Sequence, residues 1–132
     1  MKSRYENIQR MLGKIGDYGC FFLSLLSIAE EYLDRRVDLV DTVRIALDRK
    51  WTQADYTVLD DCALLSYLTG KKVTKRCESS VGVVKLNEYT IAKWYNPATN
   101  YKHFRRRGWD VYDNSVTVRD GYIMCYYVYT IG

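Results

Sequence analysis

The most constraining feature of this sequence is the apolar helical pattern of residues 20–33. Its apolar side chains recur every three to four residues and cover more than half of the helical circumference, which predicts a central helix packed on several sides. They are Phe21, Phe22, Leu25, Leu26, Ile28, Ala29, Tyr32 and Leu33. A membrane-crossing helix needs about twenty apolar residues, so we expect this segment to belong to a protein core.

Further helical patterns surround this segment, and β-like segments follow them. We expect helices over 4–12, 37–49 and 58–69, the first ending at Gly13 and the last at Gly70, with a loop over 13–19. Segments rich in Val, Tyr, Trp and Thr then predict strands over 73–77, 81–86, 89–95, 101–106, 109–112, 116–119 and 122–130. Helices followed by strands predict an α+β protein with N-terminal helices packed on a C-terminal antiparallel sheet.

Composition and length restrict the class of protein further. The 132 residues fit a single domain spanning 1–132, because there is one proline, no linker-like stretch and no internal repeat. The first residues contain no apolar core of a signal peptide, which predicts a cytoplasmic protein with reduced cysteines and no membrane partner. Four irregularly spaced cysteines and one histidine exclude the usual zinc-site spacings, so no metal is expected.

Cys20 stands at the start of the central apolar helix, directly after Gly19. Unpaired N–H groups and the helix dipole favour a thiolate at this position, and the same N–H groups suit a developing oxyanion. Glycine beside the cysteine would let a substrate backbone approach closely. The alternative is that Cys20 is a small buried apolar residue like its neighbours.

His103 is the single imidazole in the chain, so any Cys–His mechanism must use it. It lies in a segment that alternates as a strand. If the following hairpin turns about Gly108, His103 is set opposite Asp113, whose carboxylate would orient the imidazole. A register shift of one residue would favour Asn114 or Tyr112 instead, and the segment after residue 112 also reads as a simple turn.

The Gly19-Cys20 pair at the head of a buried helix, the His103-Phe104 pair and the Tyr112-Asp113 pair together resemble the papain-like cysteine peptidases. The likeness is to the compact group related to bacteriocin-leader peptidases and to small uncharacterised prophage- and plasmid-borne proteins. It implies a papain-like fold in which Cys20 is the nucleophile, His103 the base and Asp113 the orienting residue.

The sequence also departs from that family in two places. The family often has an oxyanion-hole glutamine a few residues before the nucleophile, whereas the nearest glutamine here is Gln9, eleven residues upstream, so Asp17 or the backbone would have to substitute. The residues after the His-Phe pair are usually apolar, but here they are arginines at 105–107. Both departures leave room for a degenerate, non-catalytic member.

The basic hairpin of residues 102–107 is the one charge cluster that suggests a partner. Arg105 shares a strand face with His103, which predicts a basic cleft mouth suited to an acidic protein or peptide, with Arg107 and Trp109 as further binding residues. An aromatic, basic surface also suits single-stranded nucleic acid, which we rank lower because no recognised motif is present. A solvated hairpin, with Arg106 facing Asp110, is the plain alternative.

The sequence therefore predicts a cysteine-dependent hydrolase of the thiol-protease type, acting on a peptide or isopeptide with no cofactor. The alternative is a catalytically degenerate papain-like binding module from a phage or other mobile element, for example an inhibitor of a host protein or of a nucleic-acid-associated complex. Loss of Cys20 would abolish the first function and spare the second.

Overall fold

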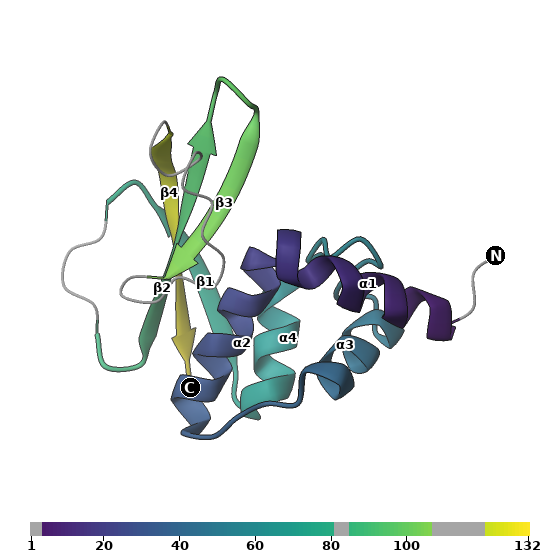
Figure 1. The fold of residues 1–132 in the computed structure, drawn as a ribbon. Coiled ribbons are helices and arrows are strands. Elements are labelled where there is room, and N and C mark those ends of the chain that lie inside the picture. The colour runs from purple at the N-terminus through teal and green to yellow at the C-terminus, as the bar shows by residue number, and fades with distance from the viewer. Residues whose placement is uncertain (1–3, 81–84, 107–120) are drawn as a thin grey trace.

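Helices lie against one face of an antiparallel sheet in the computed structural model, which describes residues 4–80, 85–106 and 121–132 (Figure 1). The helices in these residues are α1 (Arg4–Tyr18), α2 (Cys20–Leu33), α3 (Leu39–Asp48) and α4 (Asp61–Thr69). The strands are β1 (Val73–Glu78), β2 (Glu88–Asn96), β3 (Tyr101–Arg106) and β4 (Tyr122–Ile131). The α+β class, with helices first and an antiparallel sheet after them, is confirmed.

Local signals predicted most of these elements closely. The bounds of α2 and β3 match the prediction, and α4 ends at Gly70, which adopts the left-handed conformation with φ 69°. The expected loop over 13–19 is wrong, because α1 continues through Gly13 to Tyr18. Burial of Met11 and Ile15, one turn apart on α1, offsets the roughly 1 kcal/mol that an interior glycine costs a helix. The expected strands over 109–112 and 116–119 lie outside the described residues, as does most of 81–86.

The junction between α1 and α2 is a sharp bend centred on Gly19. The segments Glu6–Ile15 and Cys20–Leu33 are inclined by 87°. The Gly19 N–H donates to the Ile15 carbonyl at 2.9 Å, and a Cβ on residue 19 would stand 2.5 Å from that same oxygen. The tight bend at the end of α1 therefore requires glycine at position 19, a structural reason that the sequence interpretation did not anticipate. In the described residues no single helix is long and apolar enough to cross a membrane.

The sheet has the strand order β1-β4-β2-β3, and each neighbouring pair is antiparallel. Its helix-facing side carries Ile91, Tyr129 and Ile131, which join Phe22 and Leu25 of α2 in the core. The outer ends of β2, β3 and β4 extend past the helical layer (Figure 1). The sheet thus has one part that is packed against α2 and another that overhangs it.

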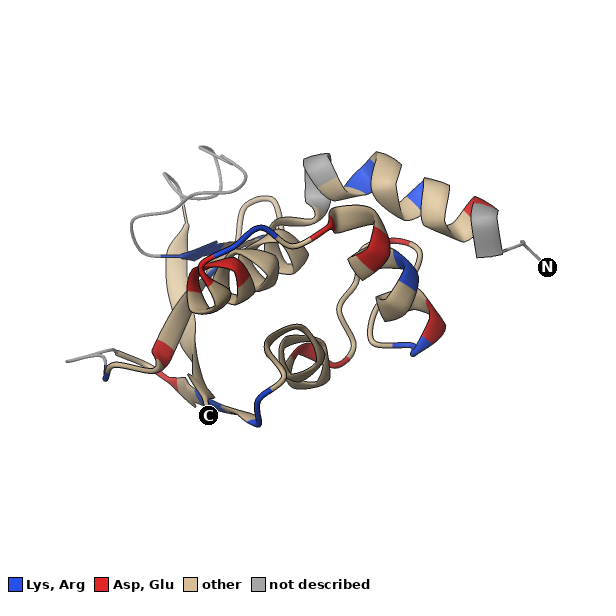
Figure 2. Ribbon diagram, turned by 90° about the horizontal axis from the view of Figure 1, so that it is seen from below, with Lys and Arg blue, Asp and Glu red and all other residues tan. Residues whose placement is uncertain are grey.

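Two ionic contacts attach the helices to the sheet. Asp61, in the first turn of α4, accepts hydrogen bonds from the Tyr129 hydroxyl at 2.6 Å and from Lys75 Nζ at 2.7 Å. Burial raises the pKa of Asp61, but the hydrogen bonds from Lys75 and Tyr129 outweigh it and hold the pKa below its usual value. At the other contact, Arg106 of β3 pairs with Glu31 near the end of α2. Figure 2, in which the ribbon is coloured by charge, shows acidic and basic residues interspersed over the helices and the sheet.

Candidate functional site

A hollow of about 540 Å³ opens where the head of α2 meets the overhanging part of the sheet. One wall is the first turn of α2 with the preceding residue, 19–21, and a second is the loop 56–58 between α3 and α4. The third wall comes from the sheet and comprises Asn100, Lys102, Phe104 and Tyr127. The hollow therefore collects residues from four separate parts of the chain.

Three aromatic rings form the apolar surface of this hollow. The rings of Phe21 and Phe104 stack with their centroids 4.4 Å apart and an interplanar angle of 22°. Tyr127 of β4 lies beside both, with centroid distances of 5.8 Å to Phe21 and 6.1 Å to Phe104. Such a surface suits an apolar or aromatic group of a ligand.

Backbone hydrogen bonds within the loop between α3 and α4 hold the wall that this loop contributes to the hollow. The Gln53 N–H donates to the Thr57 carbonyl at 2.8 Å, and the Leu59 N–H donates to the Trp51 carbonyl at 2.6 Å. At the apex, Tyr56 has φ 74°, a conformation that non-glycine residues adopt rarely and that is often found at functional sites. Nothing in the local sequence marked Tyr56 as a site residue.

Lysines supply the positive charge around the aromatic rings. Lys102 lines the hollow, and Lys93 Nζ lies 5.9 Å from the Phe104 centroid and 5.8 Å from the Tyr127 centroid. Lys75 Nζ is closer to the Tyr127 ring, at 3.8 Å, but it is also bound to Asp61. Within residues 4–80, 85–106 and 121–132, neither Lys93 nor Lys102 forms an ion pair.

Cys20 is the first residue of α2 and lies on the wall of the hollow with 5% of its surface exposed. Its helix has Gly19 at the N-cap position, with no side-chain hydrogen bond to the first turn. All four cysteines are thiols. Burial and the neighbouring Asp61 carboxylate raise the pKa of Cys62 to about 11, which keeps that thiol protonated at neutral pH.

His103 does not share the face of β3 that borders the hollow. Lys102 and Phe104 both line the hollow, and His103 lies between them in a strand paired without interruption to β2. Because successive side chains of a strand point to opposite faces, the His103 side chain is directed away from Cys20. It is fully buried beside its cross-strand partner Trp94. Arg105 shares the face of His103, as the sequence indicated, but that face is not the one lining the hollow.

The structure describes only some of the remaining predicted site residues. Asp113, Arg107 and Trp109 lie outside the described residues, as do the alternatives Asn114 and Tyr112, and so does the side chain of Asp17. Gln9 is exposed on α1 and is not among the residues that line the hollow. Gly19 does line it, next to Cys20.

Among the described residues, the cation that lines the hollow is Lys102, with Lys93 beside its aromatic rings, whereas the predicted Arg105 lies on the opposite face of β3. Strand alternation in 101–106 was the signal that could have identified Lys102, because it assigns Lys102 and Phe104 to one face and His103 and Arg105 to the other. Only the pairing of β2 with β3 and β4 brings Lys93 to the same place.

Comparison of the chain with known proteins found no matching family model, curated protein or solved structure.

Proposed function

We propose that this chain is a binding protein whose hollow at the head of α2 receives an apolar side chain of a partner protein. The observation that carries the proposal is the aromatic surface formed by Phe21, Phe104 and Tyr127 inside a hollow of about 540 Å³. Ligand sites in proteins commonly enclose about 300–1,000 Å³ and combine apolar walls with a few polar groups. The hollow has both properties.

The direction of the His103 side chain favours binding over catalysis. A nucleophilic cysteine needs its base within hydrogen-bond reach, about 2.6–3.2 Å in a working site. The alternation of β3 turns the imidazole toward the sheet face opposite Lys102 and Phe104. Binding in the hollow requires no such pair, only the aromatic surface and its open side.

The proposal is tested with 1-anilinonaphthalene-8-sulfonate, a fluorescent aromatic anion that binds accessible apolar surface. We expect the folded protein to bind it at one site. The Thr57→Trp variant, which places an indole at the exposed loop wall of the hollow, should abolish binding, and Phe104→Ala should weaken it at least fivefold. The control is Tyr67→Ala, because Tyr67 is a half-exposed aromatic residue on α4 outside the hollow. Equal binding by wild type and Thr57→Trp would refute the proposal.

A cysteine-dependent hydrolase is the second candidate, and the position of Cys20 favours it. The thiol stands in the first helical turn of α2, on the wall of a hollow large enough for a substrate side chain. Alkylation of Cys20 by iodoacetamide, followed by peptide mass spectrometry, distinguishes the two functions. In a binding protein, Cys20 should be alkylated no faster than a free thiol, both in wild type and in His103→Ala. A fast reaction that His103→Ala slows at least tenfold would establish the hydrolase instead.

A further inference from the structure

We infer that the hollow accepts an acidic peptide segment carrying one aromatic side chain. The inference rests on the proposed function and specifies the chemistry of the partner. The aromatic ring would lie against Phe21 and Phe104, and the flanking carboxylates would face Lys93 and Lys102. The aromatic part of the inference follows from the rings that line the hollow, and the acidic part follows from the charges around it.

Lys93 and Lys102 differ in charge compensation from the neighbouring basic side chains on the helix-facing side of the sheet. Lys75 is neutralised by Asp61, and Arg106 by Glu31. Lys93 is partly buried against two aromatic rings, and in the described part of the chain neither it nor Lys102 has a carboxylate within ion-pair distance. Positive charges left uncompensated beside an apolar hollow are complementary to an anionic ligand.

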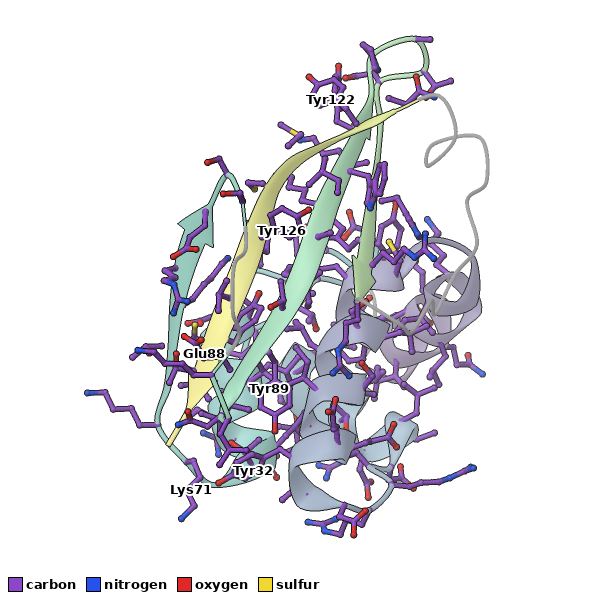
Figure 3. The ribbon with its side chains drawn as sticks, turned by 90° about the vertical axis from the view of Figure 1, so that its left-hand side faces the viewer. Tyr32, Lys71, Glu88, Tyr89, Tyr122 and Tyr126 are labelled. Atoms are coloured by element: carbon purple, nitrogen blue, oxygen red, sulfur yellow. The ribbon has the colours of Figure 1, made fainter. Side chains whose placement is uncertain are left out.

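The shape of the site favours an extended segment over a single small anion. The sheet extends past the helices (Figure 1), and Tyr122 lies near its outer tip (Figure 3). Tyr95 pairs across the strands with Lys102 on one side and with Tyr122 on the other, so all three share one face. The rings of Tyr95 and Tyr122 meet edge to face at 5.9 Å, and Tyr122 is 53% exposed. A few extended residues, each spanning about 3.3 Å, can follow this face out of the hollow.

The charge balance favours an acidic peptide over nucleic acid. A nucleic-acid chain carries a charge on every phosphate, and proteins that bind it commonly neutralise several of these at once. This chain has a net charge of only +4, and among residues 4–80, 85–106 and 121–132 the charges at the hollow without an ion-pair partner are those of two lysines. Two carboxylates flanking an aromatic residue match that pair without leaving further charges unopposed.

The test uses a labelled pentapeptide with blocked ends, in which tryptophan is flanked by one glutamate on each side and glycine occupies both end positions. Fluorescence anisotropy at low ionic strength should show binding to wild type that weakens about tenfold in the double variant Lys93→Gln, Lys102→Gln, as expected for losing two partly desolvated charge pairs. Lys71→Gln is the matched control, since exposed Lys71 lies at the opposite end of the sheet from Tyr122 (Figure 3). It should change the affinity less than twofold.

Three comparison ligands separate this inference from the proposed function. A peptide with lysine in place of each glutamate should not bind, and one with alanine in place of tryptophan should bind at least tenfold more weakly. If the lysine peptide binds as well as the glutamate peptide, the acidic specificity is overturned while the hollow remains a binding site. If neither the glutamate peptide nor 1-anilinonaphthalene-8-sulfonate binds, the peptide inference and the proposed binding function both fail. Tighter, steeply salt-dependent binding of an eight-residue oligothymidylate would overturn the peptide inference in favour of nucleic acid.

Discussion

Replacing Gly19 by alanine should destabilise the protein through the α1–α2 bend. The added Cβ would stand 2.4 Å from Ile15 Cγ1, 2.5 Å from the Ile15 carbonyl oxygen and 2.8 Å from its Cα. Two of these three atoms belong to the backbone of α1, so a rotamer change cannot relieve the overlap and the backbone at the bend must shift. Overpacking of this kind costs about 1–3 kcal/mol. The lower entropy of the unfolded chain with alanine returns about 0.4–1 kcal/mol, which leaves a net loss of about 1–2 kcal/mol.

Gly13 provides the matched control for this substitution. It lies inside α1, and a Cβ there would meet no atom within 4 Å. Gly13→Ala should therefore stabilise the protein by about 0.5–1 kcal/mol, through helix propensity and unfolded-state entropy. Urea denaturation followed by circular dichroism gives both values, and thermal melting should show Gly19→Ala several degrees below wild type. A Gly19→Ala variant as stable as Gly13→Ala would refute the packing argument for the bend.

Two further predictions follow from the environment of Asp61. The pKa of this carboxyl is lowered in the folded protein, so its contribution to stability is present above its unfolded pKa of about 3.9 and is lost as the pH falls through the folded pKa. Asp61→Asn should therefore lower the free energy of unfolding by about 2 kcal/mol at pH 7, and urea titrations should show this difference from wild type shrinking toward pH 3. A difference that stays constant with pH would contradict the assignment. Cys62, with its pKa raised to about 11, should react with iodoacetamide at pH 8 at least about tenfold more slowly than an unperturbed thiol, as measured by peptide mass spectrometry. A reaction rate equal to that of a free thiol would contradict its burial beside Asp61.

Local sequence signals predicted the secondary structure of much of this protein. The apolar stripe of residues 20–33 corresponds to α2, and Gly70 closes α4 in the left-handed conformation that favours glycine. The alternating segment 101–106 corresponds to β3. These signals are local, because a helix cap and a strand period depend on residues only a few positions apart. The same local reasoning failed at Gly13, where burial of the neighbouring α1 positions outweighs the helix-breaking tendency of one glycine.

The side chains that surround Cys20 are set by packing between distant segments of the chain. The residue stands at the head of α2, as the sequence indicated, but the neighbours that line its hollow come from the loop containing Tyr56, from β3 and from β4. Strand register selects Lys102 and Phe104 for the hollow and turns His103 to the other face, and a shift of one residue would reverse that choice. A register is fixed by packing between segments distant in the chain. The local pattern of residues therefore revealed that 101–106 forms a strand, and only the packed sheet decided which of its faces meets α2.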